Sequence, residues 1–207
     1  REDKERQLHV FRKMVRFAAF VSFPAMLGLA FVAPEFISVT IGEKWMSSVP
    51  ILQILCFLGA IYPIWLLYTQ ILISHGKSDL YLYGNMCQGA VQLVLLYCMA
   101  SYGIKWMVVT YVITYFIFLF FWHYWVHKII HMRIVYLAKD IFPYLSITIG
   151  VFILVSCLIH LFSDNYILLF LKIMLSVSLY TSVLWFSKSV VFRESINLLL
   201  KKKIKER

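Results

Sequence analysis

The chain has 207 residues, of which 62% are apolar and 14% are charged, and its formal net charge is +10. This apolar fraction exceeds what a water-soluble domain of the same length can bury, so the composition excludes a soluble domain and indicates one membrane domain. Basic residues that face anionic lipid headgroups account for the positive charge. We therefore expect membrane lipids as neighbours and no nucleic acid as a partner.

Six long apolar stretches predict six transmembrane helices, because each is long enough to cross about 30 Å of hydrocarbon at about 1.5 Å per residue. Their approximate ranges are 17–41, 49–74, 80–101, 104–126, 141–161 and 166–187. The longest connection between them is 126–140. A backbone in lipid finds no external hydrogen-bond partner, so every span is expected to be helical. The fold class predicted is therefore all-α, a polytopic membrane protein with its transmembrane domain at 17–187.

The basic residues alternate between the two sides of these spans. Of the 20 Lys and Arg residues, 17 fall at the two chain ends and on every second connection, 2 fall on the other connections, and Lys172 lies within a span. Cytoplasmic segments retain Lys and Arg, so both chain ends are expected in the cytoplasm. The lead 1–16 and the tail 188–207 combine basic residues with apolar stripes, which predicts that both lie on the membrane surface.

Two prolines lie near the middle of predicted spans. Pro24 in the first span and Pro63 in the second each remove a backbone hydrogen bond, which predicts a kink. Two interpretations stay open: hinges on which the helices bend, or static kinks accommodated by neighbouring helices.

The third span carries a polar stripe, whose members are Tyr81, Asn85, Gln88 and Gln92. Spacings of four, three and four place these side chains on one helical face. Amide groups in hydrocarbon need partners, so the face is expected either to bind another helix or to line a hydrated cavity that can bind sugar hydroxyls. Gln70, near the end of the second span, could complete either arrangement.

Ionisable residues within the spans are few. Lys172 lies close to the outer end of the last span, where its ammonium is expected either to turn toward the membrane surface or to attract an anionic ligand. Glu35, at the outer end of the first span, is the only carboxylate near hydrocarbon, so we expect no carboxylate relay through the middle of the chain.

Three histidines with a spacing of four, His123, His127 and His131, could bind a metal from one helix face, but no Asp, Glu or Cys accompanies them locally. We interpret them as anchors at the membrane surface and expect no metal, no cofactor and no catalytic residue.

Several short segments resemble helices of a known transporter family. They are FRK at 11–13, FPAMLGL at 23–29, APEFI at 33–37, IGEKW at 41–45 and QILISHGKSD at 70–79. These segments are similar to the ninth and tenth helices of Wzx-type polysaccharide flippases, which belong to the multidrug/oligosaccharidyl-lipid/polysaccharide (MOP) exporter superfamily with MATE exporters and the lipid II flippase MurJ. The resemblance implies that the chain is part of the second lobe, helices nine to fourteen, of a fourteen-helix transporter.

The resemblance further implies that the longer protein flips undecaprenyl-diphosphate-linked oligosaccharide across the bacterial cytoplasmic (inner) membrane, for assembly of O-antigen, capsule or exopolysaccharide. In such a transporter Tyr81, Asn85, Gln88, Gln92 and Gln70 are expected on the glycan side of the cavity. Arg16 and Lys172 are expected to attract anionic groups. Polysaccharide polymerase machinery is an expected partner.

Two other functions stay open. A MATE-like small-molecule exporter would be expected to carry acidic cavity residues, which these spans lack. A membrane enzyme of glycan assembly normally needs a long external loop, whereas the connection 126–140 is predicted on the cytoplasmic side.

Overall fold

The computed structural model describes residues 2–159 and 165–186, which form helices and contain no strand. The elements are α1 (Glu2–Thr40), the 3-10 helix η1 (Glu43–Ser48), α2 (Val49–Ser74), α3 (Ser78–Met99), the 3-10 helix η2 (Ala100–Tyr102), α4 (Ile104–Ile130), α5 (Ile134–Leu158) and α6 (Asn165–Phe186). The predicted all-α fold class is confirmed.

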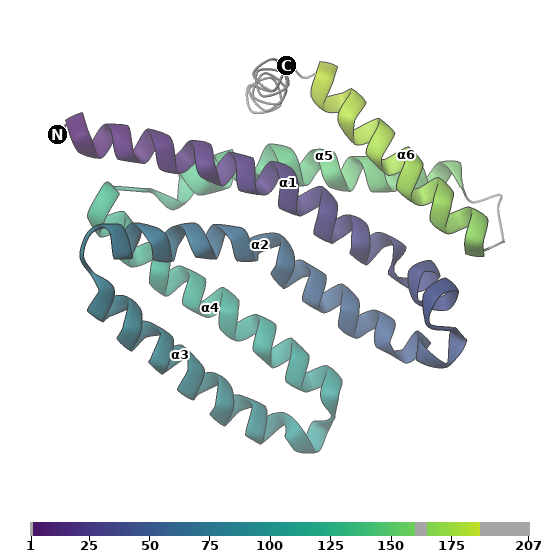
Figure 1. Ribbon diagram of the computed structural model, residues 1–207, viewed down its shortest axis with the longest axis horizontal. Coiled ribbons are helices and arrows are strands. Elements are labelled where there is room, and N and C mark those ends of the chain that lie inside the picture. Colours follow the sequence, from purple (N-terminus) through teal and green to yellow (C-terminus); the bar gives the residue numbers. More distant parts are fainter. Residues whose placement is uncertain (1, 160–164, 187–207) are drawn as a thin grey trace, which may run out of the picture.

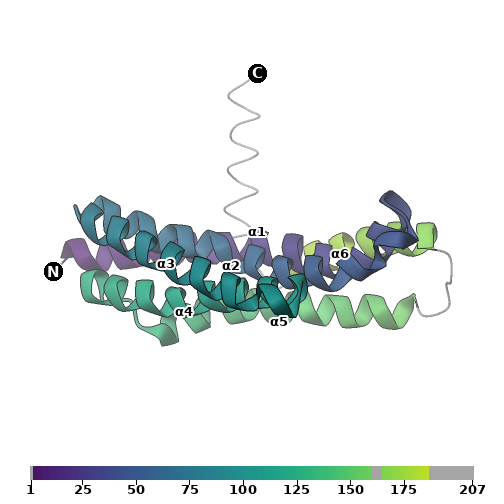
Figure 2. The same cartoon turned by 90° about the horizontal axis from the view of Figure 1, so that it is seen from below.

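The long helices run antiparallel to one another in chain order, and α1 lies at the centre of the arrangement (Figure 1). It packs against α2, α5 and α6, while α4 packs against α2 and α3 packs chiefly against α4. Figure 2 shows that α4 and α5 lie in a second layer beside the one that holds α1 and α2. As a result α1, α2, α4 and α5 surround a common space.

Five of these segments are long and apolar enough to cross a membrane: Lys4–Thr40, Glu43–Ser74, Ile104–Ile130, Ile134–Leu158 and Asn165–Trp185. The sixth long helix, α3, carries the polar stripe and is less apolar than the others. The chain is thus a multi-pass membrane protein of helices, and the crossing of the membrane by α3 stays a prediction.

Helix ends differ from the predicted boundaries at two places. The lead 1–16 is not a separate element in its described part, because α1 is continuous from Glu2 through the first predicted span. The connection predicted at 126–140 is much shorter, since α4 continues to Ile130 and α5 begins at Ile134. Amphipathic sequence at a membrane surface is also helical, so composition alone places such ends poorly. The tail 188–207 lies outside the described residues.

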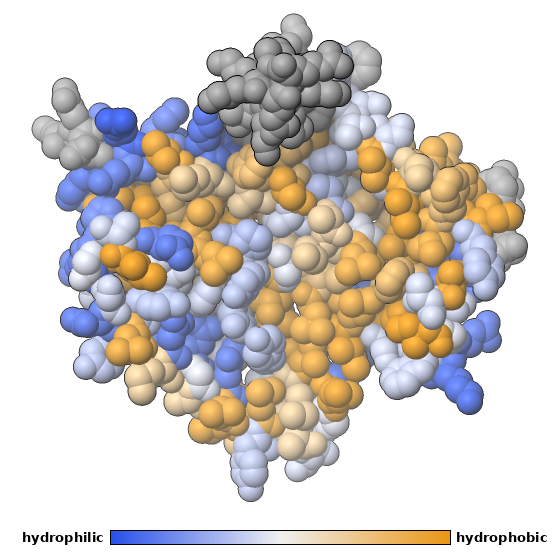
Figure 3. All heavy atoms as spheres, viewed as in Figure 1, coloured by the Kyte–Doolittle hydropathy of each residue, from blue (hydrophilic) through white to orange (hydrophobic). Residues whose placement is uncertain are grey.

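Large apolar side chains cover much of the described surface. Leu93, Phe120, Ile153 and Phe170 are each exposed, and Leu93 reaches 72%. Soluble monomers rarely carry contiguous apolar surface of this extent, whereas a membrane domain requires it. On the face drawn in Figure 3, hydrophilic residues gather where α1 begins and hydrophobic residues cover the middle of the molecule.

Prolines interrupt three of the long helices. Pro24 and Pro34 lie inside α1, Pro63 inside α2 and Pro143 inside α5. Both α1 and α2 change direction partway along their length (Figure 1), as expected where proline removes a backbone hydrogen bond. Whether Pro24 and Pro63 act as hinges stays a prediction.

Close packing between α3 and α4 depends on a glycine. A Cβ added at Gly84 would lie 2.5 Å from the ring of Trp122, whose side chain is fully buried. Small residues let membrane helices approach closely, and here the space is filled by an indole ring. Gly84 therefore sets the distance between the two helices.

We predict that Gly84→Ala lowers the midpoint of thermal unfolding in mild detergent, because overpacking costs about 1–3 kcal/mol. Gly89→Ala on the same helix is the matched control, since a Cβ there meets nothing within 4 Å. The control is expected to be neutral or slightly stabilising, because alanine favours helix over glycine. Equal midpoints for the two variants would contradict the role assigned to Gly84.

Candidate functional site

The predicted polar stripe lies on the face of α3 that packs against the protein. Gln88 is 4% exposed, while Tyr81, Asn85 and Gln92 are half-buried. The ring of Tyr81 lies 6.2 Å from that of Trp122 on α4. The stripe therefore faces a neighbouring helix and not lipid, as the spacing predicted.

Two amide atoms of this stripe are buried without a hydrogen-bond partner among the described residues. They are Oε1 of Gln88 and Nε2 of Gln92. An unsatisfied buried polar atom costs about 1–3 kcal/mol, so this face has unused hydrogen-bonding capacity. Gln70, the fifth glycan-side candidate, is exposed on α2 and is not brought into the buried part of the stripe.

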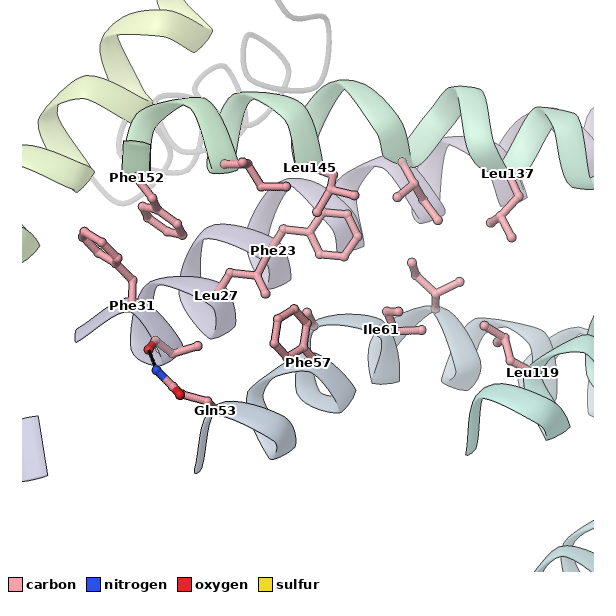
Figure 4. A pocket seen from close by; sticks show the side chains of 15 residues that line it. Phe23, Leu27, Phe31, Gln53, Phe57, Ile61, Leu119, Leu137, Leu145 and Phe152 are labelled. Carbon is pink, nitrogen blue, oxygen red and sulfur yellow. Dashed lines mark hydrogen bonds between the residues drawn. The ribbon is translucent and has the colours of Figure 1, made fainter. Parts of the chain in front are cut away.

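An apolar cavity of about 660 Å³ lies between α1, α2, α4 and α5. Figure 4 shows side chains of α5 pointing toward those of α1 and α2 across this space. Its lining consists of Phe23, Leu27, Ala30, Phe31, Gln53, Phe57, Ala60, Ile61, Ile64, Leu119, Leu137, Ile141, Leu145, Ile149 and Phe152. Gln53 is the polar exception, and its amide donates to the Ala30 carbonyl at 3.1 Å. The cavity suits an apolar group, and no member of the polar stripe lines it.

Arg16, a candidate for anionic groups, belongs to a charge cluster at one end of this cavity. Arg12 donates to both carboxylate oxygens of Asp140, from Nε at 2.7 Å and from Nη2 at 2.9 Å. Arg16 Nε lies 3.4 Å from Asp140 Oδ1. The Asp140 side chain is 4% exposed, and it precedes the cavity residue Ile141 in α5. A bidentate pair of this kind fixes α1 against α5.

Sequence reasoning missed Asp140. A signal was present, because Arg12 and Arg16 are one helical turn apart and so share a face. A carboxylate just ahead of an apolar run was the available partner for that face.

Lys172, the second candidate for anionic groups, already has an anionic partner. Its Nζ lies 2.7 Å from Oε1 of Glu35 on α1, and both side chains are largely buried. The ammonium also lies 4.6 Å from the ring centroid of Phe31, which stacks on Phe152 at the other end of the cavity. The structure thus brings Lys172 and Glu35 together, a pairing that sequence reasoning did not predict.

The three histidines on α4 do not converge. The Nδ1 of His123 lies 2.9 Å from the Tyr68 hydroxyl, and the Nδ1 of His127 lies 3.0 Å from the Met132 carbonyl oxygen. His131 ends the helix in a left-handed conformation with φ of 55°. Each ring is therefore placed by a different neighbour, and the described residues hold no group of three metal-ligating side chains.

We predict that Asp140→Asn lowers the thermal unfolding midpoint more than Arg16→Gln does. The first change removes the acceptor of two charge-assisted hydrogen bonds, a loss of about 1.5–3 kcal/mol each in other proteins. The second removes one longer contact from a half-buried side chain, worth about 1 kcal/mol or less. Equal shifts in mild detergent would contradict the assigned geometry.

Comparison with known proteins identifies relatives. Residues 1–50 match the family of polysaccharide biosynthesis proteins. A membrane protein of the cps region of Klebsiella pneumoniae is 33% identical over 96 residues, which cover 46% of this chain and 20% of the relative. The teichuronic acid biosynthesis protein TuaB of Bacillus subtilis is 37% identical over 73 residues, covering 35% and 15%.

The lipopolysaccharide biosynthesis protein WzxC of Escherichia coli is 32% identical over 79 residues, which cover 38% of this chain and 16% of that protein. The chain thus matches a fifth or less of the length of these relatives. No solved structure matches the chain. The resemblance predicted from the sequence is confirmed: the chain is related to Wzx-type membrane proteins of polysaccharide biosynthesis.

Proposed function

We propose that the chain is part of a transporter that flips undecaprenyl-diphosphate-linked oligosaccharide across the bacterial cytoplasmic membrane, for assembly of a surface polysaccharide. The observation that carries this proposal is the similarity of a helical membrane domain to proteins named for teichuronic acid and lipopolysaccharide biosynthesis. A flippase performs no covalent chemistry, so helices that bend and cavities that accept a lipid are the parts it needs.

Three structural features support the proposal. The proline-kinked helices α1 and α2 form two walls of the 660 Å³ cavity, whose lining accepts an apolar chain. The buried amides of Gln88 and Gln92 offer unused hydrogen-bonding groups that suit sugar hydroxyls. Basic residues collect where α1 begins, the end we assign to the cytoplasm with both chain termini. Polysaccharide polymerase machinery is the partner that the flipped product would meet.

A MATE-like exporter of small molecules and a membrane enzyme of glycan assembly are the alternatives. The cavity lining favours the flippase over the exporter of cations, because it contains no acidic side chain. The short connection between α4 and α5 favours it over the enzyme among the described residues, because His131, Met132 and Arg133 are too few to form a catalytic loop.

Deletion of the gene in its host tests the proposal. We expect complete lipid-linked oligosaccharide to accumulate on the cytoplasmic leaflet and surface polysaccharide to disappear, with both reversed by the wild-type gene. Accumulation of a chemically incomplete intermediate would instead indicate an enzyme. Normal surface polysaccharide combined with drug sensitivity would indicate an exporter.

Replacement of both Gln88 and Gln92 by Leu tests the glycan-side assignment in the whole protein. We expect the thermal midpoint to stay level or rise, because two buried polar atoms without partners are removed. We expect surface glycan display to fall strongly, because the hydrogen-bonding groups are lost. Met86→Leu with Val94→Leu on the exposed face of α3 is the matched control. Unchanged display at normal protein level would assign the stripe to helix packing alone.

A further inference from the structure

Glu35 and Lys172 form an ion pair between two helices of the membrane domain. Glu35 lies about a turn and a half before the end of α1, and its side chain is 12% exposed, against 14% for Lys172. Charges in hydrocarbon are costly and rare outside functional sites. Replacing a buried ion pair by apolar residues of similar volume is often neutral or stabilising. Stability alone therefore does not explain why the pair is present.

The two charges have unequal surroundings. Lys172 contacts Glu35 Oε1, the ring of Phe31 and, at 3.5 Å, the carbonyl oxygen of Phe31. Glu35 Oε2, by contrast, is buried without a hydrogen-bond donor among the described residues. An anionic oxygen that lacks a donor in a low-dielectric environment carries a desolvation cost that a bound proton removes.

Other groups at this end of α1 do not supply the missing donor. The described charged residue that contacts Glu35 is Lys172, while α2 and α5 present Gln53 and Phe152, which do not ionise. The charged residues of the connections at this end are Glu43, Lys44 and Lys105, all of them exposed. His160 and Asp164 lie outside the described residues.

We propose that Glu35 is an intramembrane proton-binding site whose ionisation state controls the attachment of α6 to α1. The ionised carboxylate holds Lys172 and so ties the two helices together. A proton taken from water at this membrane surface adds to the carboxylate oxygen, and no covalent bond of the chain breaks. The neutral acid no longer attracts the ammonium, which then turns toward the nearby membrane surface.

Release of Lys172 acts on the cavity through Phe31. This ring carries the ammonium on one side and stacks on Phe152 with a centroid distance of 4.9 Å, and both rings line the cavity. Loss of the cation therefore frees the aromatic pair that closes one end of the cavity. The inference goes beyond the proposed function, because it assigns an ion to the chain and does not depend on the cargo.

Infrared difference spectroscopy between neutral and acidic pH tests proton binding in the whole protein in lipid nanodiscs. We expect a C=O band of a protonated carboxylic acid that disappears in Glu35→Gln and persists in Asp140→Asn, the matched change at the other ion pair of α1. Lys172→Met keeps the carboxyl group and is expected to show the band at higher pH, because the opposite charge is gone. A band that persists unchanged in Glu35→Gln would overturn the proposal.

Cysteine cross-linking at one fixed pH tests the attachment of α6. Ser38 Oγ and Asn165 Nδ2 lie 3.1 Å apart across the same two helices, so Ser38→Cys and Asn165→Cys report their contact. Cys56, Cys87, Cys98 and Cys157 are first replaced by Ala. We expect Glu35→Gln to slow disulfide formation about tenfold, which corresponds to about 1.4 kcal/mol.

Adding Lys172→Met to Glu35→Gln is expected to restore the rate of cross-linking, because no unpaired ammonium remains. This double variant also gives a folded chain if the single change prevents folding, since breaking one side of a buried pair costs about 3–5 kcal/mol. Cross-linking of Glu35→Gln at the wild-type rate would overturn the control of helix attachment. So would a folded double variant that cross-links at a slowed rate.

Discussion

Charged side chains on α1 must be paired where the helix is buried, and this constraint organises the rest of the molecule. Arg12 near one end pairs with Asp140 on α5, and Glu35 near the other end pairs with Lys172 on α6. An unpaired charge in a low-dielectric interior is strongly unfavourable, so each pair selects which helix lies beside which end of α1. The central helix is thereby fastened at both ends to different neighbours.

The apolar cavity occupies the space between these two fastenings. Ile141 beside Asp140 lies at one end, and Phe31 beside Lys172 lies at the other. Pro24 interrupts α1 between the two ion pairs, so bending there would reshape the cavity while its ends stay attached. The polar stripe of α3 lies apart from this space, against α4. Under the proposed function, apolar and polar parts of a cargo would therefore meet different surfaces of the domain.

Several features were predictable because they depend on local chemistry. Each apolar stretch forms a helix, since lipid leaves the backbone no other partner. The polar stripe faces the protein because Tyr81 and Gln88 share one helical face. The cavity was not predictable: Phe23 and Phe152 are far apart in sequence and look like ordinary lipid-facing residues. The unused amides of Gln88 and Gln92 were equally hidden, because satisfaction of a hydrogen bond depends on the neighbouring helix.

The sequence by itself determined the membrane class, the all-α fold and the family resemblance, because these follow from composition, periodicity and short segments that are contiguous in the chain. Only the tertiary structure decided the partners of its charges. Lys172 and Arg16 read as free cations in the sequence, whereas Glu35 and Asp140 neutralise them from residues more than a hundred positions away. Electrostatic pairing depends on distances of a few ångströms, and helix packing alone sets those distances.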